Sequence, residues 1–110
     1  MKLNQQNLKQ ALQGITIIEV SGESCANCLT LYPILNQIIK NRSDCVLHHL
    51  EIDENTAPIA LNWHIESVPT ILIMKDEEEY ARCRGYQPYE ILELWIDAKI
   101  EQIKEKFGIN

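Results

Sequence analysis

Two cysteines separated by two residues, Cys25 and Cys28, stand where the character of the chain changes. The residues before them, 15–20, are β-branched and nearly all apolar, which predicts a strand buried on both faces. Residues 21–23, Ser-Gly-Glu, break this pattern. From residue 25 to about residue 39, apolar side chains recur at helical spacing. The cysteine pair therefore lies at the start of a helix that follows a buried strand, which favours folds in which strands and helices alternate.

The rest of the chain continues this alternation. Residues 75–78 separate two apolar segments and are few enough to join them as an antiparallel hairpin. The expected elements are a helix at 4–13, a strand at 15–20, a helix at 25–39, a buried strand at 45–52, a helix at 54–63, strands at 68–74 and 80–84, and a helix at 88–107. This order predicts one α/β domain over residues 1–110, with a mixed central sheet of about four strands flanked by helices.

Composition and charge exclude several classes of function. The 110 residues include 16 acidic and 10 basic side chains, and the net charge of −6 opposes nucleic-acid binding, which depends on neutralising phosphates. No apolar run approaches the roughly 20 residues of a membrane helix. The polar N-terminal segment lacks the apolar stretch of a secretory signal, so we expect a cytoplasmic protein without a membrane partner. In a reducing cytoplasm, closely spaced thiols indicate catalysis or metal binding rather than a disulfide framework.

The position of the cysteine pair determines its expected chemistry. A thiol in the first turn of a helix faces unpaired backbone N–H groups and the positive end of the helix dipole, and both favour the thiolate. Cys25 is therefore the expected nucleophile, and Cys28, one turn further on, can resolve a mixed disulfide formed at Cys25.

A metal site is an alternative for the same two thiols, because zinc sites also use closely spaced cysteines. Such a site usually needs four ligands. The remaining candidates, none of them in a second closely spaced pair, are Cys45, Cys83, His48, His49 and His64. We therefore expect no metal, and we expect Cys45 and Cys83 to be thiols of the core or of strands.

Several motifs, in this order and spacing, resemble those of the thioredoxin family. They are the strand TIIEV before the cysteines, Pro33, Ile52-Asp53 at a strand end, SVPT at 67–70, and Gly85. The resemblance covers residues 15–107. It implies a thioredoxin-like three-layer fold and a thiol–disulfide oxidoreductase that reduces or exchanges protein disulfides.

The resemblance also implies where a substrate binds and how the protein is recycled. The Val68–Pro69 bond is expected to be cis and to lie beside the cysteine pair, and the backbone of Val68 is expected to pair with an extended substrate segment. Together with Gly85, these are the candidate substrate-binding residues. The family implies a monomer in cell redox homeostasis that needs no bound cofactor and is reduced by an NADPH-dependent thioredoxin reductase or by low-molecular-weight thiols.

The chain departs from the family pattern around the cysteines. Thioredoxins have Trp-Cys-Gly-Pro-Cys, whereas this chain has SCANC, and the two residues between the cysteines tune the redox potential. Glu19 stands where thioredoxins have a buried aspartate, and His49 stands where they have a lysine. A buried carboxylate can relay the proton of Cys28. His49, as its partner, would make the activity depend on pH near neutrality.

These departures leave a second function open. The unusual SCANC motif also fits a thioredoxin-fold module that binds a dedicated partner or senses redox state, with little general reductase activity.

The last helix has an apolar side whose later part packs either on the domain or on a partner. This side is formed by Ile91, Leu92, Trp95, Ile96, Ile100, Ile103 and Phe107. Cys83, on a possible edge strand, is a candidate for glutathionylation or an intermolecular disulfide.

Overall fold

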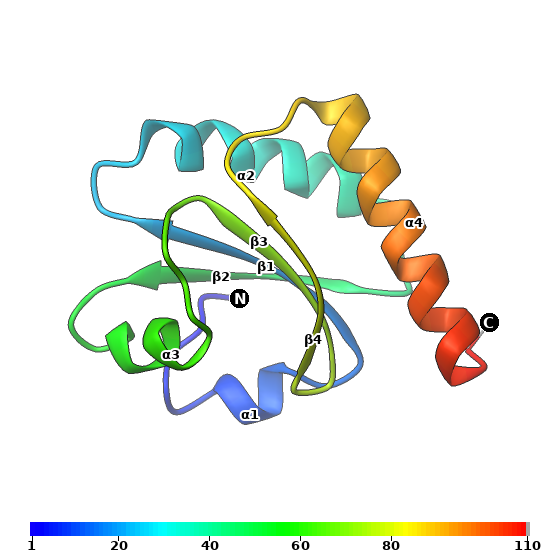
Figure 1. Ribbon diagram of the computed structural model, residues 1–110, viewed down its shortest axis with the longest axis horizontal. Coiled ribbons are helices and arrows are strands. Elements are labelled where there is room, and N and C mark those ends of the chain that lie inside the picture. Colours follow the sequence, from blue (N-terminus) through cyan, green and yellow to red (C-terminus); the bar gives the residue numbers. More distant parts are fainter. Residues whose placement is uncertain (110) are drawn as a thin grey trace.

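The computed structural model describes residues 1–109, which fold into eight elements in the predicted order (Figure 1). The elements are α1 (Leu8–Ala11), β1 (Ile15–Gly22), α2 (Ala26–Ile39), β2 (Val46–Ile52), α3 (Ala57–Asn62), β3 (Thr70–Lys75), β4 (Glu78–Arg84) and α4 (Tyr89–Phe107). The first helix is shorter than the sequence predicts, because only its central turn is helical.

The four strands form one mixed sheet in the order β2-β1-β3-β4. β1 and β2 are parallel and are joined through α2, whereas β3 is antiparallel to both β1 and β4. Figure 1 shows α2 and α4 over one face of the sheet and α1 and α3 over the other. The predicted mixed sheet with helices on both faces is confirmed.

An apolar cluster lies on each face of the sheet, and the alternation of side chains along β1 explains both. Ile17 belongs to the cluster beneath α2 and α4, and its neighbour Ile18 belongs to the cluster beneath α1 and α3. Glu19 and Ser21 follow Ile17 at alternate positions. The same strand that supplies the core therefore directs two polar side chains toward α2.

The strand predictions differ from the structure in detail. β3 begins two residues later than predicted, and β4 begins two residues earlier. The sequence predicts that β1 ends at residue 20, but its ladder with β2 continues to Gly22, which pairs with Ile52. The Ser-Gly pair is typical of a turn, yet here it extends a strand because β2 continues beside it. The sequence also predicts that 45–52 is a buried strand. β2 instead lies at the edge of the sheet, and Val46 is 51% exposed.

Most of the apolar stripe of α4 packs on the domain, although Phe107 at its end is 43% exposed. Ile96, Ile100 and Ile103 are buried, and the ring of Phe107 lies edge-on against Tyr80 with centroids 5.6 Å apart. The prediction that Ile91 lies on the apolar side is wrong, because it faces solvent and is 55% exposed. Neither α4 nor any other helix within residues 1–109 is long and apolar enough to cross a membrane.

Candidate active site

The cysteine pair lies at the N-terminus of α2, just after the end of β1. Cys25 is the N-cap residue, and its Sγ accepts a hydrogen bond from the backbone N–H of Cys28 at 3.2 Å. A disulfide joins the two cysteines, whose Cα atoms are 5.3 Å apart. Cys28 is buried and Cys25 is partly exposed. In the reduced protein, the same N–H group would stabilise a thiolate at Cys25, the more accessible of the two sulfur atoms.

The loop before β3 lies beside the segment that leads to Cys25. A Cβ atom added at Gly22 would lie 3.4 Å from Val68 Cγ2, so the end of β1 and this loop pack closely. The Val68–Pro69 peptide bond is cis, the isomer that the resemblance implies. Gly85, with φ +84°, donates its N–H to the carbonyl of Pro69 at 2.8 Å. The candidate substrate-binding residues therefore lie together, and Val68 lines a groove of about 320 Å³.

Glu19 and His49 face each other across the parallel strands β1 and β2, where they are paired in register. His49 Nδ1 lies 2.9 Å from Glu19 Oε1, and the Glu19 side chain is completely buried. This is the distance of an ion pair, but the two groups lack the alignment of a hydrogen bond. Among residues 1–109, neither oxygen of the Glu19 carboxylate has a hydrogen-bond partner.

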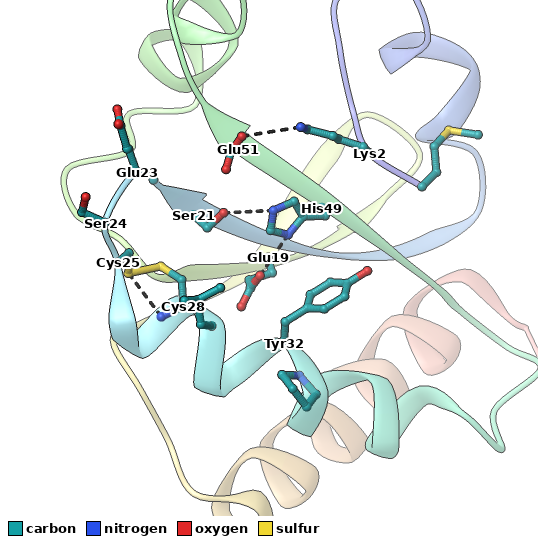
Figure 2. A pocket seen from close by; sticks show the side chains of 14 residues that line it. Lys2, Glu19, Ser21, Glu23, Ser24, Cys25, Cys28, Tyr32, His49 and Glu51 are labelled. Atoms are coloured by element: carbon teal, nitrogen blue, oxygen red, sulfur yellow. Dashed lines mark hydrogen bonds and ion pairs between the residues drawn. A yellow bond between two sulfur atoms is a disulfide. The ribbon is translucent and has the colours of Figure 1, made fainter.

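A cavity of about 690 Å³ extends from the cysteine pair to the edge of β2. Figure 2 shows its inner wall, which includes Glu19, Ser21, Cys28 and His49. Its outer wall includes exposed residues of the N-terminal segment and of the turn before α2, among them Lys2 and Glu23. The cavity therefore leads from the molecular surface inward to Cys28 and His49, and the fully buried Glu19 carboxylate lies at its inner end.

The first three residues hold the backbone of His49 at the outer edge of β2. Leu3 donates its N–H to the carbonyl of His49 at 2.7 Å, and His49 donates its N–H to the carbonyl of Met1 at 2.9 Å. Leu3 is buried in the cluster beneath α1 and α3. Beside them, Lys2 Nζ lies 3.5 Å from Glu51 Oε2 at the rim of the cavity. The position of His49 is therefore fixed from its outer side as well as by β1.

The other cysteines and histidines do not line the cavity. Cys45 is buried next to β2, where burial raises the pKa of its thiol to about 11, and burial also raises the pKa of the half-buried Cys83. His48 lies on the opposite face from His49, with its Nε2 3.1 Å from the carbonyl oxygen of Ala11, and burial lowers its pKa. Within the part of the chain that the structure describes, no three His, Cys, Asp or Glu side chains group as metal ligands.

The predicted site residues thus gather on two sides of the cysteine pair. Glu19 and His49 lie at the cavity. Val68 lies at the groove, while Pro69 and Gly85 are joined by their hydrogen bond. Two further residues that the sequence does not indicate contact His49. They are Ser21, whose Oγ lies 3.0 Å from His49 Nε2, and Tyr32, whose ring meets His49 edge-on with centroids 5.1 Å apart. The signal that identifies Ser21 is the alternation along β1, once the strand is extended to Gly22.

The matching family model, two sequence relatives and a matching solved structure are all described as thioredoxins. Residues 1–98 match the sequence model of the family described as Thioredoxin. A thioredoxin from Chlamydia pneumoniae is 32% identical over 79 residues, which cover 72% of this chain and 76% of that protein. A thioredoxin from Alicyclobacillus acidocaldarius subsp. acidocaldarius is 30% identical over 96 residues, covering 84% and 90%. The solved structure of a mutant thioredoxin from Halobacterium salinarum matches this fold with a TM-score of 0.79 at 20% identity, covering 91% of this chain and 89% of that chain.

A thioredoxin-like sheet with a disulfide-forming CxxC pair at the start of α2 defines a class of thiol–disulfide oxidoreductases. The chain belongs to the thioredoxin family. Both the predicted fold and the predicted protein-disulfide oxidoreductase activity are confirmed.

Proposed function

We propose that the protein reduces protein disulfides with Cys25 as the nucleophile and Cys28 as the resolving thiol. The observation that carries this assignment is the hydrogen bond from the Cys28 N–H to Cys25 Sγ, which favours negative charge on that sulfur. The partial exposure of Cys25 and the burial of Cys28 support the same order of attack.

The reaction consists of two exchanges. The Cys25 thiolate attacks one sulfur of the substrate disulfide, and the other substrate sulfur leaves as a thiolate and takes a proton from solvent. Cys28 then loses its proton and attacks Cys25 Sγ, which breaks the mixed disulfide and releases the second substrate thiol. Two electrons have passed from the protein dithiol to the substrate, and the Cys25–Cys28 disulfide has formed.

The groove beside Val68 is the proposed place for the substrate chain. Its wall contains Gly22 at the end of β1, Glu23 and the loop residues 65–68, so an extended segment there would lie beside the segment that leads to Cys25. Backbone pairing with Val68 would provide affinity without requiring particular side chains. The hydrogen bond from Gly85 to Pro69 would keep this loop in place.

Glu19 is the proposed acceptor of the Cys28 proton, with His49 as its partner. Both line the same cavity as Cys28, and the carboxylate has no competing hydrogen bond within residues 1–109. A proton acceptor held at such a position can accelerate the second exchange, because only the thiolate of Cys28 attacks.

The oxidised protein must be reduced again before the next turnover. A thioredoxin reductase that draws on NADPH, or a low-molecular-weight thiol, would supply the two electrons by exchange at the same cysteines. This scheme needs no cofactor bound to the protein, and the redox homeostasis of the cytoplasm is its proposed setting.

An insulin-reduction assay with dithiothreitol tests the proposed roles. The wild type and Cys83→Ser should accelerate precipitation of the insulin chains, and Cys25→Ser should be no faster than the blank. Equal activity of Cys25→Ser and the wild type would show that Cys25 is not the nucleophile.

A trapping experiment separates a general reductase from a dedicated module. Cys28→Ser cannot resolve the mixed disulfide, so it should accumulate covalent complexes with many proteins when applied to a mixture of oxidised proteins. Capture of one protein alone would favour the partner-binding or redox-sensing module over a general reductase.

A further inference from the structure

The imidazole of His49 is held by three contacts within the cavity (Figure 2). Its Nδ1 lies 2.9 Å from Glu19 Oε1, its Nε2 lies 3.0 Å from Ser21 Oγ, and its ring meets Tyr32 edge-on at an interplanar angle of 79°. Glu19 and Ser21 are alternate residues of β1, so the strand presents a carboxylate to one ring nitrogen and a hydroxyl to the other. The two nitrogens therefore face different groups, a carboxylate at Nδ1 and a hydroxyl at Nε2.

Exposure to solvent increases from Glu19 to His49. The Glu19 side chain is 0% exposed, whereas that of His49 is 24% exposed at the rim of the same cavity. A proton accepted by Glu19 therefore has no direct contact with solvent. The imidazole is the neighbouring group that can pass it outward, because each of its nitrogens can hold or release a proton.

A hydroxyl opposite Nε2 is compatible with either tautomer of the ring. When Nδ1 holds the proton and faces the Glu19 carboxylate, the Ser21 hydroxyl donates to Nε2. When Glu19 holds the proton, Nε2 holds the ring proton and donates to the hydroxyl oxygen. A methyl group at this position would satisfy neither state.

We propose that Ser21 is a positioning residue that orients His49 toward Glu19 and completes an exit path for the proton of Cys28. This inference rests on the proposed role of Glu19 as the acceptor of that proton. The proton passes from Cys28 to Glu19 and then to Nδ1, while the proton on Nε2 passes to the hydroxyl, whose own proton leaves into the cavity. One proton enters the path and one leaves it, and Glu19 returns to its carboxylate form. The ring, which began with its proton on Nε2, ends with it on Nδ1, and proton exchange with water at the partly exposed imidazole restores the first tautomer before the next turnover.

Other charged or titratable groups in the cavity come from every element around His49. They are Glu19 on β1, Glu23 and Cys25 in the turn before α2, Cys28 and Tyr32 on α2, Glu51 on β2, and Lys2 with the Met1 amino group in the N-terminal segment. Lys2 and Glu51 lie 3.5 Å apart and offset each other. Substitution of Ser21 changes no charge among these groups. A changed rate in the variant is therefore due to loss of the hydroxyl and not to a changed electrostatic field in the cavity.

The test compares Ser21→Ala with Ser21→Thr, which keeps a hydroxyl, and with Ser43→Ala, which removes an exposed serine outside the cavity. Reduced protein is mixed with a peptide disulfide, the reaction is quenched with acid, and the mixed disulfide is followed by mass spectrometry from about pH 5 to about pH 8. A second measurement, the rate at which iodoacetamide alkylates Cys25, reports the first thiolate separately. Circular dichroism verifies that each variant is folded.

We expect resolution of the mixed disulfide in Ser21→Ala to slow about tenfold near neutral pH, less than the 100-fold or more typical of losing a proton-transfer group itself. The dependence of this resolution rate on pH should also change in Ser21→Ala. Ser21→Thr should restore both the rate of resolution and its pH dependence. Cys25 should be alkylated in Ser21→Ala at the same rate as in the wild type. The inference is overturned if Ser21→Ala resolves like Ser43→Ala at every pH, or if Ser21→Thr is as slow as Ser21→Ala. If the wild type reduces no peptide disulfide at all, the proposed function fails, and this inference falls with it.

Discussion

The cysteines outside the active pair differ from Cys25 in the environment of their sulfur atoms. Cys45 is buried and the pKa of its thiol is raised to about 11, so at pH 7 only about one molecule in ten thousand has a thiolate there. Cys25 instead faces the N–H of Cys28 at a helix start. We predict that iodoacetamide modifies Cys25 of the reduced folded protein first and Cys45 last, with the half-buried Cys83 between them.

Peptide mass spectrometry after short exposures near pH 7 measures this order. Reaction in a denaturant provides the control, because unfolding removes the difference in burial and should bring Cys45 and Cys83 to similar rates. Modification of Cys45 as fast as Cys25 in the folded protein would contradict the prediction.

The residues of the site differ in how far the sequence could identify them. Cys25 and Cys28 were predicted from their spacing and from the patterns on either side, because helix-start chemistry is local. Glu19 and His49 were identified by resemblance, and their contact depends on strand register. Ser21 could not be found, because its contact with His49 requires both the extension of β1 and the orientation of a ring on another strand.

At the level of elements, α4 offers a matched pair of isoleucines. Ile100 is fully buried against the sheet, whereas Ile91 is 55% exposed on the same helix. We predict that Ile100→Ala lowers the free energy of unfolding by about 2–5 kcal/mol, because it leaves a cavity in the core. Ile91→Ala should change it by no more than about 0.5 kcal/mol.

Urea unfolding followed by circular dichroism measures both values. The comparison also tests the packing of the α4 stripe, since the sequence left open whether it covers the domain or a partner. Similar small effects of the two substitutions would contradict the burial of Ile100 in the isolated chain.

An ion-pair cluster joins the segment between α2 and β2 to α4. Asp44 lies 2.9 Å from Arg42 and 2.6 Å from Lys104 of α4. The hydrogen bond from Arg42, and then that from Lys104, lower the pKa of Asp44 below its ordinary value. Because this pKa is lower in the folded than in the unfolded protein, the cluster stabilises the fold above about pH 4, and the contribution is lost as the pH falls further.

We therefore predict that Asp44→Asn lowers the free energy of unfolding at pH 7 by about 1 kcal/mol. The difference from the wild type should shrink as the pH falls below about 4, where Asp44 of the unfolded chain is protonated before Asp44 of the folded protein. Urea unfolding at a series of pH values measures it, with Glu101→Gln, an exposed position on α4, as the control. A difference that is the same at all pH values would show that the charge of Asp44 plays no part.

The order and type of all eight elements could be predicted because apolar runs and helical periodicity are local signals. The position of a strand within the sheet is not local. β2 and β3 each contain four apolar residues, yet β3 lies in the centre with five of its six residues buried, and β2 lies at the edge. The boundary of β1 was missed for the same reason, since its last residues are extended only because a neighbouring strand pairs with them.

At the scale of the whole molecule, both edges of the sheet are protected against pairing with another copy. Residues 1–3 pair with the outer edge of β2 at His49. The other edge, β4, carries charged side chains, which disfavour edge-to-edge association. These are Glu78, Glu79, Arg82 and Arg84. The net charge of −6 adds repulsion between copies.

We predict that the protein is a monomer in solution. The Cα radius of gyration is 13.2 Å, close to the value of about 13 Å expected for one compact chain of this length. Light scattering after gel filtration should give a mass of 12.7 kDa, and X-ray scattering should give a radius near that of the single chain.

Measurement at two salt concentrations separates the two causes of this monomeric state. Salt at about 1 M shortens the range of charge repulsion to about 3 Å, whereas hydrogen bonds that cover a strand edge persist. If the covered edges suffice, the mass should remain that of one chain at both concentrations. A mass that doubles only at high salt would show that net charge, rather than the protected edges, keeps copies apart. A doubled mass at both would contradict the monomer itself.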